Sequence, residues 1–149
     1  MQLIEVTDGQ GRVIAPDWLL AAEATHRQLR AGLPADYAAK MQRVFAQGGR
    51  MVVAADGDAV LGVAVWRVYE NTYNDVQVYV DDLVTDDTRR STGVGRALID
   101  WLTARAQMLS ASKLTLDSGT QRVDAHRFYL RERFHITAFH FEKKLDQKS

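Results

Sequence analysis

A strand pattern that runs into a glycine turn and a helix most constrains how this chain can fold. Across residues 76–81, apolar and polar residues alternate, as in a strand with one buried face. The alternation slips at Asp81 and Asp82, after which Leu83 and Val84 are both apolar. Such a slip predicts a β-bulge, which bends a strand and frees backbone groups from pairing.

The segment after this strand predicts an anion site. A polar loop leads to Ser-Thr-Gly-Val-Gly at residues 91–95, and an amphipathic helix begins at Val94. Glycines at a loop-to-helix junction let a ligand approach the backbone, and the first free N–H groups of the helix attract negative charge. A pyrophosphate suits such a junction. The alternative explanation is that Gly93 and Gly95 only shape a turn against the sheet.

The other elements follow from periodicity and from turn residues. The predicted elements are a strand at 2–6, helices at 16–30 and 36–47, strands at 51–55 and 59–69 joined by Asp56-Gly57-Asp58, the bulged strand at 76–85, the helix from Val94, a strand at 113–117, a helix at 122–132 and a strand at 136–143. This order predicts an α/β fold with a mixed, mostly antiparallel central sheet flanked by helices. A length of 149 residues predicts one domain, residues 1–149.

Composition excludes several classes of protein. There is no cysteine, which rules out a disulfide framework, a thiolate zinc site and a cysteine nucleophile. The 19 basic and 19 acidic residues cancel, so the chain lacks the positive excess of a nucleic-acid or membrane-surface binder. Neither an apolar run of about 20 residues nor a signal-peptide pattern occurs, so we expect a cytoplasmic protein. The spacing of His126, His135 and His140 predicts no metal site.

Two familiar phosphate-binding motifs do not fit the glycine loop. A P-loop needs Gly-Lys followed by Ser or Thr, but Arg96 and Ala97 follow Gly95. A dinucleotide fingerprint needs a third Gly or Ala where Leu98 stands, and its glycines follow the strand directly. An NAD-type oxidoreductase is therefore disfavoured.

The remaining loop pattern, Arg or Gln-x-x-Gly-x-Gly or Ala, resembles that of the GCN5-related N-acetyltransferase (GNAT) superfamily. Residues 81–85, residues 90–95 and residues 124–129 with Phe134 stand in the order of the family's motifs. The resemblance covers most of the chain. It implies a single GNAT-like domain in which the bulged strand splays from its neighbour.

The resemblance also implies acetyl-CoA as cosubstrate, without a metal. Backbone groups of the splayed strand would pair with the pantetheine arm, and loop amides would hold the pyrophosphate, with Arg90 at the family's first loop position. A tyrosine on the later helix, here Tyr129, commonly protonates the departing CoA thiolate. The implied cofactor-binding residues are Leu83, Val84, Thr85, Arg90, Ser91, Thr92, Gly93, Val94, Gly95 and Arg96.

The implied function is an N-acetyltransferase that moves an acetyl group from acetyl-CoA directly to a primary amine of a small molecule or peptide. The alternative is a non-catalytic acyl-CoA-binding or regulatory domain of the same fold. An ammonium with a pKa of ~10.4 must lose a proton before it attacks a thioester. Asp81 is the first candidate for the base or amine anchor, because the matching position in polyamine acetyltransferases is acidic. Weaker candidates are Asp82, Glu70, Tyr73 and Tyr79.

The acceptor and the assembly are less defined by the sequence. In the family, the N-terminal helices and the loop near residues 70–75 face the acceptor, and homodimers are common. The residues offered there are Trp18, His26, Tyr69, Glu70, Tyr73 and Asp75. Their mixed chemistry suits a cationic amine, a peptide terminus or an aromatic amine.

Three positions depart from the family pattern. Arg122 replaces a frequent Asn, so its amide contact to the pantetheine region is not expected. Ser91 replaces a frequent glycine, which fits if its φ is negative. Arg133 stands where a glycine is usual, so a positive φ there would strain the turn.

Overall fold

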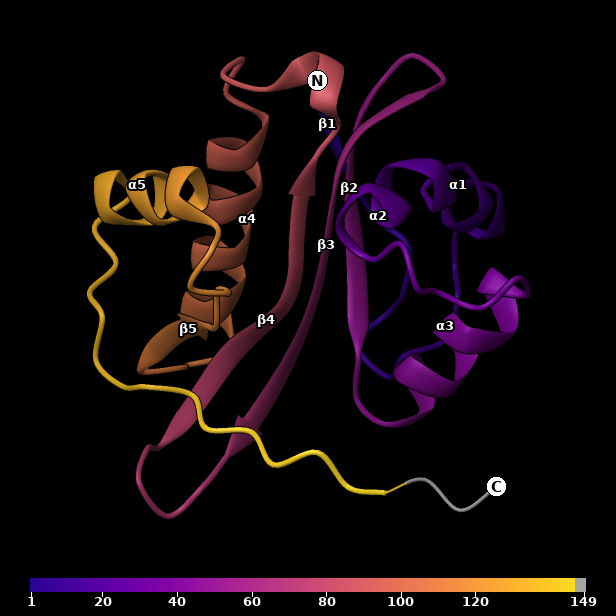
Figure 1. The fold of residues 1–149 in the computed structure, drawn as a ribbon. Coiled ribbons are helices and arrows are strands. Elements are labelled where there is room, and N and C mark those ends of the chain that lie inside the picture. The colour runs from indigo at the N-terminus through magenta and orange to yellow at the C-terminus, as the bar shows by residue number, and fades with distance from the viewer. Residues whose placement is uncertain (147–149) are drawn as a thin grey trace. The chain divides into compact units, whose positions relative to one another are not determined.

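Five strands form one mixed sheet in the order β1-β2-β3-β4-β5 in this computed structural model (Figure 1). The strands are β1 (Gln2–Glu5), β2 (Arg50–Asp56), β3 (Ala59–Glu70), β4 (Val76–Thr85) and β5 (Lys113–Leu116). The first four pair antiparallel, and β5 pairs parallel to β4. The predicted α/β fold with a mixed, mostly antiparallel sheet is confirmed.

The structure describes residues 1–146. The chain divides into two units, Met1–Leu116, which contains the whole sheet, and Asp117–Ser149. None of the helices within the described residues is both long enough and apolar enough to span a bilayer. The expectation of a single domain stays a prediction.

The helices of the first unit lie on both faces of the sheet. α1 (Pro16–Ala21), α2 (Glu23–Leu29) and α3 (Tyr37–Ala46) lie on one face, and α4 (Val94–Met108) lies on the other (Figure 1). The helix predicted at 16–30 is interrupted at Ala22, which keeps right-handed helical dihedral angles. Asp36 caps the N-terminus of α3, and its side chain accepts a hydrogen bond from the backbone N–H of Ala39.

One part of the core lies between the N-terminal helices and the sheet. Tyr37, Met41 and Phe45 recur at helical spacing along α3, and each is at most 2% exposed. They pack in one cluster with valines from the central strands, including Val63 and Val65 of β3. This packing holds α3 against the sheet.

The predicted bulge is present in β4. Val65 of β3 pairs with Asp82, while the next residue, Trp66, pairs with Val80. Asp81 is therefore the extra residue of the bulge. The pairing of β4 with β5 covers only residues 77–80, so no strand in the described part of the chain pairs with that side of residues 81–85. The splayed strand that the resemblance implied is confirmed.

A glycine in β3 fixes the position of the α4 N-terminus. A Cβ atom on Gly62 would lie 2.8 Å from Cγ1 of Val94 and 3.0 Å from the carbonyl oxygen of Val84. Because no side chain fits there, the first turn of α4 packs directly on β3. The loop between β4 and α4 is thus held at the end of β4.

The second unit contains α5 (Val123–Arg131) and an extended C-terminal segment. The strand predicted at 136–143 is wrong, since these residues have no strand assignment. Ile136, Phe139 and Phe141 are 76–90% exposed there. An apolar pattern indicates what a segment would bury, but a strand also needs a partner edge, and no backbone pairing of this segment occurs within residues 1–146.

Candidate active site

The loop predicted to hold a pyrophosphate winds tightly before α4. A short 3₁₀ turn, η1 (Asp87–Arg89), is capped by Asp86, and the Thr92 hydroxyl donates to the carbonyl of Arg89. Ser91 has a φ of 62°, so the condition under which a serine fits this position, a negative φ, is not met. The chain reverses between η1 and α4 within a few residues, and Ser91 and Gly93 both take left-handed conformations to do so.

The α4 N-terminus has the features of an anion site. The first α-helical hydrogen bond runs from the N–H of Ala97 to the carbonyl of Gly93, and no side chain caps the helix. The preceding N–H groups, those of residues 94–96, have no acceptor within the helix. A Cβ atom on Gly93 would meet nothing within 4 Å, so space lies open above the loop. Arg90 and Arg96 are exposed on either side. These residues fit a pyrophosphate.

Asp81, at the bulge, is bound by a guanidinium. Arg67 Nε lies 3.0 and 3.1 Å from the two carboxylate oxygens of Asp81, and Arg67 Nη2 lies 2.5 Å from Oδ2. The pKa of Arg67 is raised chiefly by this hydrogen-bonded contact. The Asp81 carboxylate is therefore oriented by β3.

Asp82 is held from α2. Its Oδ2 atom lies 2.7 Å from Nε2 of His26, and its Oδ1 atom lies 2.8 Å from Nε of Arg30. Burial alone would raise the pKa of Asp82, but hydrogen bonds and charge from His26 and Arg30 outweigh it and lower the pKa. Arg30 also donates from Nη2 to the carbonyl oxygen of Asp81, 3.1 Å away, so it contacts both residues of the bulge.

His26 connects Asp82 to a buried tyrosine. The His26 ring is 1% exposed, and its Nδ1 atom lies 2.8 Å from the hydroxyl of Tyr37. Burial raises the pKa of Tyr37, with further contributions from the charges of Glu23 and Asp82, so the phenol is protonated at neutral pH. An ionised carboxylate can only accept, so Nε2 of His26 donates to Asp82. In that tautomer Nδ1 accepts from Tyr37.

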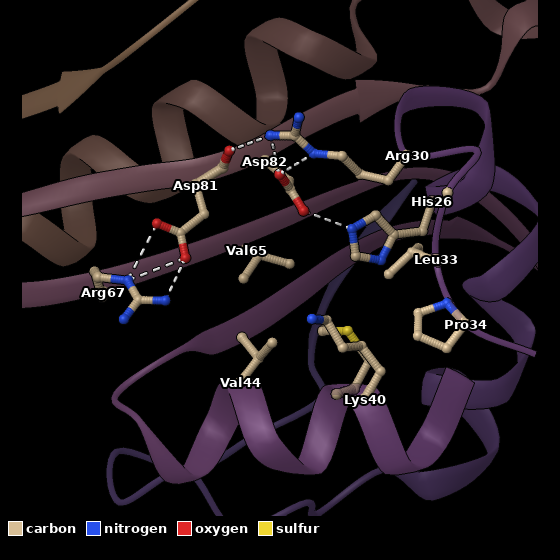
Figure 2. A pocket seen from close by; sticks show the side chains of 12 residues that line it. His26, Arg30, Leu33, Pro34, Lys40, Val44, Val65, Arg67, Asp81 and Asp82 are labelled. Atoms are coloured by element: carbon tan, nitrogen blue, oxygen red, sulfur yellow. Dashed lines mark hydrogen bonds and ion pairs between the residues drawn. The ribbon is translucent and has the colours of Figure 1, made fainter. Parts of the chain in front are cut away.

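Asp81, Asp82 and His26 line one cavity of about 460 Å³, which we call the bulge cavity (Figure 2). Helices α2 and α3, the loop between them and strands β3 and β4 form its walls. Its ionisable lining residues are His26, Arg30, Lys40, Arg67, Asp81 and Asp82. Leu33, Val44 and Val65 contribute apolar surface. Cavities of this size hold small molecules.

Tyr129 belongs to the second unit. It lies on α5, with its ring centroid 5.4 Å from that of Phe128 and 5.7 Å from that of Phe134. Burial raises the pKa of Tyr129, against a smaller opposing effect of the Arg122 charge. Tyr129 is therefore protonated at neutral pH, the state that a general acid requires.

Sequence reasoning missed three cationic residues of the bulge cavity, namely Arg30, Lys40 and Arg67. Arg67 follows a buried apolar run in β3, and an arginine at such a position needs a partner. Arg30 stands four residues after His26, at the C-cap of α2. Lys40 gave no such signal. Of the six residues predicted to face the acceptor, only His26 lines this cavity.

Comparison with known proteins identifies the family. The sequence model of the acetyltransferase (GNAT) family matches residues 17–134. The chain belongs to this family. The GNAT match includes the bulge, the glycine loop and α5. No group of three or more His, Cys, Asp or Glu side chains within residues 1–146 is placed to hold a metal ion.

Two curated relatives are N-acetyltransferases. The uncharacterized N-acetyltransferase YhdJ of Bacillus subtilis is 39% identical over 67 residues, which are 44% of this chain and 47% of that protein. The aminoalkylphosphonate N-acetyltransferase of Salmonella typhimurium is 35% identical over 66 residues, which are 44% of this chain and 43% of that protein. The matched region is thus less than half of each relative.

Solved structures share the fold over nearly the whole chain. The aminoglycoside N-acetyltransferase AAC(6')-Iy, in complex with CoA, has a TM-score of 0.82 and 14% identity, and the match covers 97% of this chain and 93% of that one. The aminoglycoside acetyltransferase meta-AAC0020, from an uncultured soil metagenomic sample, has a TM-score of 0.77 and 16% identity, with 97% and 96% covered. At these identities the likeness concerns the fold alone.

Proposed function

We propose that this protein transfers an acetyl group from acetyl-CoA directly to a primary amine of a small molecule or peptide. One observation supports this most strongly: the free edge of β4 beyond the bulge runs into the uncapped N-terminus of α4. The first feature offers backbone groups to an extended ligand arm, and the second offers N–H groups to phosphates.

Each feature has its own part in binding. Backbone groups of Leu83, Val84 and Thr85 pair with the pantetheine arm, and the loop from Ser91 to Arg96 donates N–H groups to the pyrophosphate. Arg90 adds a positive charge at the start of the loop. When bound, acetyl-CoA supplies an activated acyl group as a thioester.

Side chains of this protein manage the protons. Tyr129, protonated because burial raises its pKa, donates a proton to the leaving thiolate. Asp81, oriented by Arg67, positions or deprotonates the acceptor amine. The chain has no cysteine, so no acyl-thioenzyme forms.

The names of similar proteins suggest which acceptors to test first. The Salmonella relative is named for aminoalkylphosphonates, and the two structural neighbours are named for aminoglycosides. The family resemblance and the composition also lead us to expect a cytoplasmic enzyme and a possible homodimer.

The test is CoA thiol release over a panel of simple amines, amino acids, aminophosphonates, aminoglycosides and peptides. We expect amine-dependent release with at least one class. Acetyl-CoA that raises the melting temperature without any release would instead indicate the non-catalytic acyl-CoA-binding domain. Acetyl-CoA that neither raises the melting temperature nor reacts would contradict both.

A further inference from the structure

The negative charges of the two bulge carboxylates, Asp81 and Asp82, are already paired with cationic side chains of the bulge cavity. Asp81 accepts from Arg67 through two nitrogens, and Asp82 accepts from Arg30 and His26. The carboxylates would attract a cationic acceptor if they stood alone. With each bound by a guanidinium, an added cation would have to compete with a bond that already exists.

Lys40 lies in the same cavity without a counter-charge. Its side chain rises from α3 into the cavity (Figure 2), and the residue is half-buried. Within residues 1–146 its ammonium group forms no hydrogen bond or ion pair. A partly buried ammonium gains from an anionic partner, because burial removes part of its hydration.

The charge of the cavity lining therefore favours an anionic group on the ligand. Arg30, Lys40 and Arg67 give three positive charges, against two negative charges from Asp81 and Asp82, so the net charge is 3 − 2 = +1 without His26. All five side chains face one space of about 460 Å³. A polycation would meet net repulsion there, whereas a small amine that also carries an anionic group would bring Lys40 the counter-charge that it lacks.

We propose that the acceptor is a small amine with an anionic group, either a carboxylate or a phosphonate, and that Lys40 binds this anionic group in the bulge cavity. This inference rests on the proposed function. The amine lies toward the bulge. Asp82 is three residues before the end of β4, about 10 Å along the strand from its end. The anion on Lys40 thus fixes the orientation of the acceptor while its amine faces the free edge of β4.

The experiment compares matched acceptors that differ only in the anionic group. β-Alanine is compared with propylamine, and 2-aminoethylphosphonate with ethylamine, so the two pairs also separate carboxylate from phosphonate. Spermidine and an aminoglycoside serve as polycations. We expect kcat/KM from thiol release to be about tenfold or more higher for the acid of at least one pair. Equal or better use of the simple amines or polycations would overturn the proposal.

Variants of α3 test the role of Lys40. Lys40→Met retains the apolar stem, and we expect the acid-to-amine ratio of kcat/KM to fall by about tenfold. Lys40→Arg restores most of the ratio. Arg43→Met removes an exposed charge from the same helix, outside the cavity lining, and leaves the ratio unchanged. If Lys40→Met lowers kcat/KM equally for the acid and for the matching simple amine, recognition of the anion by Lys40 is contradicted.

A binding measurement separates this proposal from the enzymatic one. Calorimetry of β-alanine and 2-aminoethylphosphonate binding, with CoA present, needs no turnover. If one acid binds wild type and binds Lys40→Met about tenfold more weakly, the anion-binding role of Lys40 stands even when no acceptor reacts. If simple amines react but neither acid binds or reacts, the inference fails and the proposed function stands.

Discussion

Nε2 of His26 lies 2.7 Å from Oδ2 of Asp82, so helix α2 and the bulge of β4 are joined by a hydrogen-bonded pair 56 residues apart in sequence. The side chain of His26 is 1% exposed and that of Asp82 is 13% exposed. Arg30 and Tyr37 complete the group, one on each side. This network fixes the wall of the bulge cavity next to the proposed acceptor position.

Asp82→Asn is expected to destabilise the fold by about 2 kcal/mol at neutral pH, because hydrogen bonds to a buried charged group are lost and Arg30 faces an amide. The measurement is urea unfolding. Because hydrogen bonds and charge from His26 and Arg30 lower the pKa of Asp82 in the folded state despite burial, its contribution is present above its ordinary value of 3.8. That contribution is lost as pH falls below this value.

Wild type should therefore lose more stability than Asp82→Asn between about pH 5 and pH 2.5. The difference between the two curves isolates Asp82 from other carboxylates. Parallel curves would show that Asp82 has the same pKa in folded and unfolded states.

Gly93→Glu should weaken acetyl-CoA binding by about a hundredfold, since it places a carboxylate where phosphates are proposed to bind. Gly93 has a φ of 90°, so any side chain there also strains the backbone. Gly93→Ala has the same strain without the charge and is the matched control. Calorimetry that finds equal affinity in the Glu and Ala variants would contradict the loop assignment.

Arg133→Gly should stabilise α5 by about 1 kcal/mol. Arg133 has a φ of 68° after the end of α5, and Phe134 donates to the carbonyl of Tyr129 while Arg133 donates to that of Leu130. This pattern is a Schellman motif, which favours glycine at the left-handed position. Thermal unfolding measures the gain. An unchanged or lower melting temperature would show that the Arg133 side chain compensates for the strain.

Tyr129→Phe should lower kcat by about a hundredfold while changing acetyl-CoA affinity less than about twofold. The substitution removes the hydroxyl but retains a ring that packs between Phe128 and Phe134. Steady-state kinetics and calorimetry give the two quantities. An unaltered kcat would remove Tyr129 from the acid role.

Local patterns predicted much of the fold. The slip in alternation at Asp81 and Asp82 located the bulge, and the glycine loop located the start of α4, because both features depend on neighbours in sequence. The strand at 136–143 failed because pairing depends on a partner edge that the segment itself does not encode. The left-handed φ of Ser91 was not evident from the sequence, because the route of the loop, and not the residue type, sets that angle.

The candidate site was predicted less completely than the fold. The acidic bulge was evident from the sequence, but its neutralisation by Arg30 and Arg67 depends on contacts between residues 52 and 14 positions apart. The charge of a cavity depends on such pairs as much as on the residues themselves. Asp81 and Asp82 alone suggest a cationic acceptor, but the lining of the bulge cavity to which they belong has a positive net charge.

The most direct test of the central claim is transfer of a labelled acetyl group. The protein is incubated with acetyl-CoA labelled in its acetyl group and with an acceptor from the panel, and the products and the intact protein are examined by mass spectrometry. We predict label on the acceptor nitrogen in equal amount to the CoA released, with no label on the protein. No labelled amine with any acceptor, or label attached to the protein before transfer, would contradict direct N-acetylation.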